Sequence, residues 1–236
     1  MNEDYISKHK LFFYLAFIII GLITFYPFFT TGFGNADDLH NYLVTQKGDY
    51  FGNAKLLAYI AGRFYFYLVL PVHNLTYIND NMVITKFFQI VPIVLCILLF
   101  ARILFVMTRS KELSLLFVLL FLVLTQVSGH TSLYVTYPLF FTFSFALLLI
   151  SFLLLFHYLE SKKKKLIIYS TIFFTIGLLF YEIYLLYIVL LFFTILIYYL
   201  REKKDIKQVV KETFLLLTPY ISVSLIYVVI YFVFRI

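Results

Sequence analysis

Long apolar runs, each bounded by charged residues, are the feature that most constrains this sequence of 236 residues. A run of about 20 apolar residues matches the ~30 Å hydrocarbon core of a lipid bilayer. Hydrophobic residues make up 63% of the chain and charged residues only 13%, which is more apolar surface than a water-soluble domain can bury. The sequence therefore predicts an all-α integral membrane protein, because the open edge of a strand cannot be satisfied in lipid.

Seven of these runs predict the helices of one polytopic transmembrane bundle, a single domain over residues 1–236. The predicted spans are 11–30, 87–108, 113–128, 138–157, 166–181, 183–200 and 213–234. Between 166 and 200 the apolar run is interrupted only by Tyr181 and Glu182. A continuous helix of this length extends about 52 Å, which is too long for one span, so we expect a tight hairpin near Glu182.

The run 57–72 is the ambiguous one, because it is short and carries Arg63 near its middle. An arginine at the centre of a span costs roughly 2.5–3.5 kcal/mol on insertion scales. We therefore predict an amphipathic helix in the interface plane, within an outer loop at 31–86 that carries juxtamembrane helices. The alternative makes 57–72 an eighth span and places the N-terminus outside.

The basic residues indicate orientation, and they do not indicate a nucleic-acid partner. There are 19 Lys and Arg against 12 Asp and Glu, and most of the cations lie in short loops between apolar runs. Cytoplasmic loops carry such an excess, which predicts a cytoplasmic N-terminus. The cations on the predicted inner side are Lys8, Lys10, Arg109, Lys111, Lys162 to Lys165, Arg201, Lys203, Lys204, Lys207 and Lys211.

An acidic pair, Asp37 and Asp38, follows the first span directly. One interpretation is helix capping, with Asn35 as the N-cap and the carboxylates in the first turn, where the helix dipole favours them. The other is catalysis, because a carboxylate at the membrane boundary can take the proton of an acceptor hydroxyl. The second carboxylate would orient the acceptor or hold a divalent cation, Mg or Mn. On a helix, His40 and Asn41 would share the face of Asp37 and contact the substrate.

The segments Asn35-Ala36-Asp37-Asp38, Gly62-Arg63-Phe64 and Tyr181-Glu182 resemble the polytopic glycosyltransferases of the GT-C fold. The resemblance is to the N-terminal transmembrane part of these longer proteins and covers about residues 1–200. It implies a hexosyltransferase of the bacterial inner (plasma) membrane. The implied donor is a polyprenyl-phosphate-linked sugar, and the acceptor is an envelope glycan or a lipid. It also implies that Asp37 or Asp38 is the catalytic base.

Further residues at the predicted outer side are candidates for binding substrate. Arg63 and His130 would contact the donor phosphate, although Arg63 also suits an interface anchor and a lone loop histidine is often incidental. Glu182 is an ionisable group in an apolar stretch, which makes it a candidate for a functional role. Alternatively, it lies at a turn and is simply in contact with water. Tyr134 and Tyr137 would stack on sugar faces, or belong to the interfacial aromatic belt.

Other classes of membrane protein remain open at this point. A glycolipid transporter or flippase usually has charged or broken helices near the midplane, whereas the predicted spans carry little beyond Arg102, His157 and Glu182. A polysaccharide polymerase would share the substrate class and the side of the membrane. An inactive membrane scaffold would need none of the candidate residues.

Overall fold

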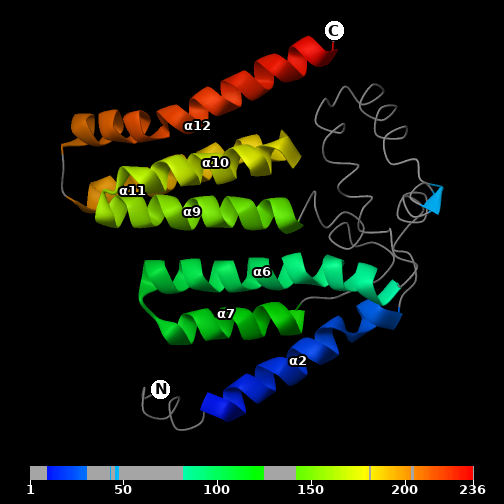
Figure 1. The fold of residues 1–236 in the computed structure, drawn as a ribbon. Coiled ribbons are helices and arrows are strands. Elements are labelled where there is room, and N and C mark those ends of the chain that lie inside the picture. The colour runs from blue at the N-terminus through cyan, green and yellow to red at the C-terminus, as the bar shows by residue number, and fades with distance from the viewer. Residues whose placement is uncertain are drawn as a thin grey trace. The chain divides into compact units, whose positions relative to one another are not determined.

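The computed structural model describes residues 10–30, 43, 46–47, 82–124, 142–180, 182–202 and 205–235. The chain divides into two compact units, which we describe separately. The first unit contains α2 (Lys10–Thr30), α6 (Met82–Thr108) and α7 (Lys111–Leu124). The second unit contains α9 (Ser144–Ser161), α10 (Lys164–Phe180), the 3₁₀ helix η3 (Glu182–Leu186), α11 (Tyr187–Arg201) and α12 (Ile206–Arg235) (Figure 1).

Each of the seven predicted spans overlaps one α-helix, and the described residues contain no strand. The all-α prediction is confirmed over this part of the chain. Four helical segments are long and apolar enough to cross a membrane: Ile90–Thr108, Ser144–Ser161, Ile183–Arg201 and Ile206–Val233. A shorter apolar segment, Leu15–Tyr26, lies within α2. By length and composition, the fold is thus that of a helical membrane protein.

Three helices of the first unit share a small apolar core. Phe25 of α2, Ile93 and Ile97 of α6, and Leu122 of α7 form one buried cluster. The Thr24 hydroxyl donates a hydrogen bond of 2.9 Å to the carbonyl oxygen of Leu122, near the last turn of α7. The C-terminal half of α2 therefore lies against the C-terminal half of α7.

Two hairpins, α6–α7 and α9–α10, turn in the same way. In each, two residues join the helices, and the first of them has a left-handed backbone: Arg109 has φ 57° and Lys162 has φ 58°. Each of these residues donates its backbone N–H to the carbonyl four residues earlier, at 2.8 and 2.7 Å. This closes the preceding helix and leaves a basic side chain at the turn.

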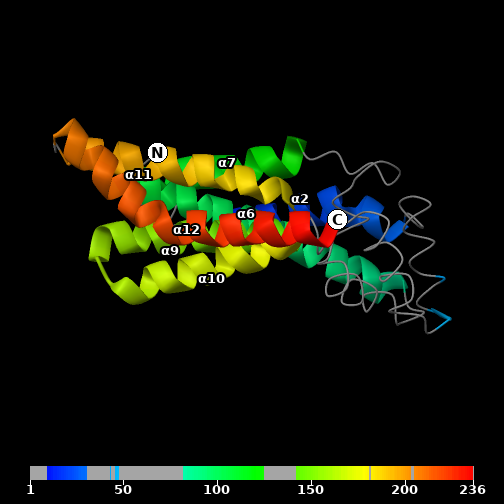
Figure 2. The same ribbon diagram turned by 90° about the horizontal axis from the view of Figure 1, so that it is seen from above.

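Small residues bring α9 and α10 close together along their hairpin (Figure 2). The hydroxyls of Ser151 and Ser170 lie 3.0 Å apart, and Ser170 also lies 2.6 Å from the Ser151 carbonyl. Seven residues further along α10, Gly177 faces Leu148 and the carbonyl of Ser144. Since lipid is as apolar as leucine, close packing and interhelical hydrogen bonds are what hold such a pair together.

The chain reverses between α10 and α11, as predicted near Glu182. Tyr187 at the start of α11 donates a hydrogen bond of 2.6 Å to the Leu148 carbonyl. Near the other end of α11, Tyr198 donates one of 2.9 Å to the Leu159 carbonyl. These two bonds show that α11 runs parallel to α9, and hence antiparallel to α10.

Candidate functional site

Most of the residues predicted to act on substrate lie outside the described residues. These are Asp37, Asp38, His40, Asn41, Arg63, His130, Tyr134 and Tyr137. The predicted interfacial helix at 57–72 lies outside them as well. Glu182 is the first residue of η3, and only its backbone is described. The assignments to these nine positions therefore stay predictions.

The first unit does establish at which end the chain leaves α2. Arg109 and Lys111 mark the turn between α6 and α7. Leu122, which accepts the hydrogen bond from Thr24, lies eleven residues beyond Lys111, or about 16 Å along α7. The chain thus leaves α2 at Thr30 from the end of the unit that is far from the basic turn. Asp37 and Asp38 follow seven and eight residues later in the sequence.

The second unit also gathers its described cations at one end, apart from Arg235, the last residue of α12. The turn Lys162–Lys165, the end of α11 at Arg201 and the start of α12 lie together there, because α11 runs parallel to α9 and ends beside it (Figure 1). The Lys162 ammonium lies over the rings of Tyr198 and Tyr199, at 5.2 and 5.3 Å from their centroids. Glu182 begins η3 at the opposite end.

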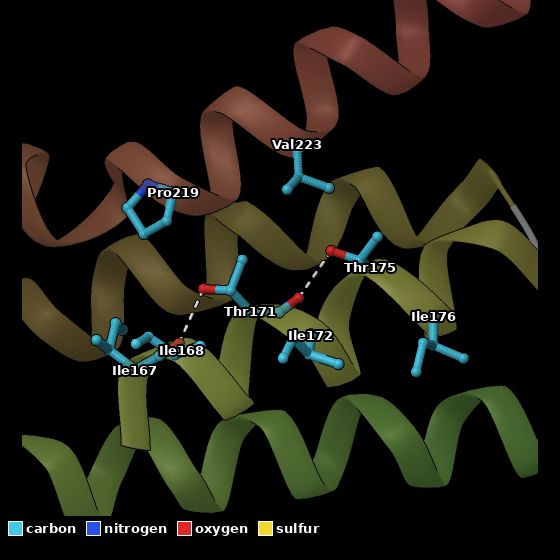
Figure 3. A pocket seen from close by; sticks show the side chains of 8 residues that line it. All are labelled: Ile167, Ile168, Thr171, Ile172, Thr175, Ile176, Pro219 and Val223. Carbon is cyan, nitrogen blue, oxygen red and sulfur yellow. Dashed lines mark hydrogen bonds between the residues drawn. The ribbon is translucent and has the colours of Figure 1, made fainter. Parts of the chain in front are cut away.

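An open groove of about 440 Å³ lies between α10 and α12 (Figure 3). Its lining consists almost wholly of carbon, from Ile167, Ile168, Thr171, Ile172, Thr175, Ile176, Pro219 and Val223. The two threonines add little polar surface to the groove, because their hydroxyls donate hydrogen bonds to carbonyls of their own helix. Thr171 donates to Ile167 at 2.9 Å, and Thr175 donates to Thr171 at 2.8 Å.

Pro219 explains why the groove is open. A proline inside a helix lacks the N–H that would bond to the carbonyl four residues back, and its ring pushes that carbonyl away. Such a residue is the usual cause of a sharp bend. α12 bends away from α10 in the part that follows Pro219 (Figures 1 and 3). The two helices stay in contact through Tyr220, whose hydroxyl lies 2.5 Å from that of Ser170.

Other polar side chains of the described helices form hydrogen bonds or a cation–π contact with nearby groups. The Ser144 hydroxyl donates to the Tyr184 hydroxyl at 3.0 Å, which joins α9 to η3. The Cys96 thiol donates to the Thr142 carbonyl at 3.0 Å. Arg102 places its guanidinium over the ring of Phe105, toward the basic end of α6. Within the described ranges, no three His, Cys, Asp or Glu side chains gather as metal ligands.

Comparisons with protein families, with curated proteins and with solved structures find no match to this chain. The site that the described residues form is therefore interpreted from its own geometry. Sequence reasoning did not identify the groove between α10 and α12. The signals for it were present, namely two threonines four residues apart and a proline inside an apolar run, but neither says which helix lies opposite.

Proposed function

We propose that this protein is a membrane glycosyltransferase that uses a polyprenyl-phosphate-linked sugar. The acceptor is an envelope glycan or a lipid, and the reaction takes place on the extracytoplasmic side. The observation that carries the proposal is that the first unit has a basic turn at one end, while the chain leading to the acidic pair starts from the other. The basic turn at Arg109 marks one end, and the chain that continues to Asp37 and Asp38 leaves α2 from the other. Basic ends of membrane helices favour the cytoplasm, which supports an outer location for the acidic pair.

In this mechanism one aspartate of the pair removes the proton of the acceptor hydroxyl as that oxygen attacks the anomeric carbon. A bond forms between the acceptor oxygen and the anomeric carbon, and the bond from that carbon to the phosphate oxygen breaks. The polyprenyl phosphate leaves with the electron pair. The other aspartate orients the acceptor or holds Mg or Mn. The residues assigned to the donor and acceptor are His40, Asn41, Arg63, His130, Tyr134, Tyr137 and Glu182.

The direct test compares Asp37→Asn and Asp38→Asn with the matched control Asp80→Asn in proteoliposomes. The readout is transfer of a labelled sugar from polyprenyl phosphate to lipid or glycan. A general base contributes roughly 10²–10⁴-fold, so we expect a loss of this size in one of the two variants and no loss in the control. Wild-type rates in both aspartate variants would reject the catalytic assignment.

A topology test is independent of the substrate. A reporter domain inserted after Phe51 is expected on the extracytoplasmic side, and one inserted after Lys163, in the turn of the second hairpin, is expected in the cytosol. A cytosolic reporter at Phe51 would place the acidic pair on the wrong face for this chemistry. The eight-span alternative, with its external N-terminus, is distinguished by a third reporter at the N-terminus.

A further inference from the structure

We infer that the groove between α10 and α12 binds one anionic phospholipid, with an acyl chain along the groove and the phosphate beside Lys164 and Lys165. The inference does not depend on the proposed function, because neither the acidic pair nor the predicted outer loop takes part. It rests on the length of the groove, on its lining and on the charges at one of its ends.

The length of the groove matches one leaflet of a bilayer. Its α10 wall runs from Ile167 to Ile176, which is about 15 Å of helix. The hydrocarbon core of a bilayer is ~30 Å thick, so the wall covers one half of it. Its volume of about 440 Å³ is within the ~300–1,000 Å³ typical of pockets for small ligands.

The lining is suited to a chain and offers nothing to a polar ligand. Isoleucines dominate the α10 wall and Pro219 and Val223 form the α12 wall, while the hydroxyls of Thr171 and Thr175 donate to carbonyls of their own helix (Figure 3). Within the membrane, a groove of this kind fills with hydrocarbon. Which lipid occupies the groove then depends on the charges at its ends.

The charges at one end of the groove select the headgroup. Lys164 and Lys165 are exposed and precede Ile168 by four and three residues, so they lie on the groove face of α10, in its first turn. No carboxylate in the described ranges forms an ion pair with either lysine. The N-terminal end of α10 adds partial positive charge at the same place.

On α12 the same face continues into a polar depression. Gln208, Glu212 and Leu215 lie at helical spacing before Pro219, and Lys207 and Lys211 line the same depression. Glu212 accepts a hydrogen bond of 2.9 Å from Gln208. Together, the first turn of α10 and this depression on α12 carry four lysines and two carboxylates, a surplus of positive charge that complements a phosphate.

The absence of tryptophan from the chain permits a clean test. Ile172→Trp places a single fluorophore at the groove, where the native side chain is 47% exposed. Leu190→Trp is the matched control on α11, where the native side chain is 51% exposed. The two positions lie at similar depth. Tyr187 is level with Leu148, and α11 runs parallel to α9, so Leu190 is level with Ser151, three residues further along. Ser151 contacts Ser170, which precedes Ile172 by two residues on α10.

The measurement is quenching of the full-length protein by brominated phosphatidylglycerol and by brominated phosphatidylcholine in bilayers. A lysine near the membrane surface attracts anionic lipid by about 1 kcal/mol, so we expect roughly a fivefold preference for phosphatidylglycerol at position 172 for each lysine engaged. At position 190 the two lipids should quench equally. Lys164→Gln with Lys165→Gln should remove the preference at 172 while quenching persists, and Glu212→Gln should increase it.

Three results would overturn the inference. The first is equal quenching of the 172 reporter by the two lipids. The second is a preference that survives loss of both lysines. The third is no quenching at 172 by either lipid, which would mean that protein, such as a second copy of the chain, covers the groove. Val223→Trp, on the α12 wall, repeats the measurement if the first reporter disturbs folding.

Discussion

Replacing Gly177 with alanine tests how closely α9 and α10 must approach. A β-carbon at this position would lie 3.0 Å from Leu148 Cδ2, 3.3 Å from Leu148 Cγ and 3.3 Å from the carbonyl oxygen of Ser144. Carbon atoms in favourable contact are ~3.5–4.0 Å apart. Leu148 is fully buried, so its side chain has little room to give way, and the Ser144 oxygen belongs to the backbone of α9, so it moves only with the helix.

The size of the effect follows from two opposing terms. Overpacking a tight core costs typically about 1–3 kcal/mol. Alanine is favoured over glycine within a helix by ~0.8–1.0 kcal/mol. The second term applies equally to Gly21 in α2, where a β-carbon would meet nothing within 4 Å. The difference between Gly177→Ala and Gly21→Ala therefore isolates the steric term, and we expect it to be about 1–3 kcal/mol in unfolding free energy.

The assay is unfolding by sodium dodecyl sulfate in mixed micelles, followed by far-ultraviolet circular dichroism. Gly177→Ala should unfold at lower detergent fraction than the wild type, and Gly21→Ala should not. In the double variant Gly177→Ala with Leu148→Ala, the loss should be smaller than the sum of the two single losses by about 0.5–3 kcal/mol, because the shortened side chain makes room. Equal stability of the two glycine variants would refute the close approach of α9 and α10.

Further predictions concern hydrogen bonds in different parts of the chain. Tyr220→Phe removes the 2.5 Å bond to the Ser170 hydroxyl and should cost about 0.5–1.5 kcal/mol in the same assay, whereas Tyr169→Phe, on an exposed ring, should cost little. Ser110→Ala removes the acceptor of the Leu113 N–H at the start of α7 and should cost about 0.5–2 kcal/mol. The backbone N–H of Glu112, and then the Ser110 hydroxyl, lower the pKa of the Glu112 carboxyl from 4.5, so the variant should raise this pKa in a carboxyl NMR titration. The stabilisation from the Glu112 carboxylate is present above its ordinary pKa and is lost as the pH falls through the lowered value, a dependence that should be absent in Glu112→Gln.

The sequence by itself determined where the helices are. The runs 11–30 and 87–108 correspond to α2 and α6, and the interruption at Glu182 marks the reversal between α10 and α11. Apolar length and flanking charge are local properties, and in lipid they leave the helix as the structure that satisfies the backbone. The boundaries differ where a helix continues into water, as in α12, which begins at Ile206 rather than at the predicted 213.

Only the tertiary structure decided which helices lie together and in what direction. Ser151, Ser170 and Tyr220 come from three helices, and no periodicity in the chain says that their hydroxyls meet. The bend follows from Pro219 itself, but the groove beside it depends on which helix lies opposite. The physical reason is that lipid and leucine are equally apolar, so hydrophobicity drives a helix into the membrane without choosing its neighbour. That choice is made by a few small residues and hydroxyls, whose partners lie far away in the sequence.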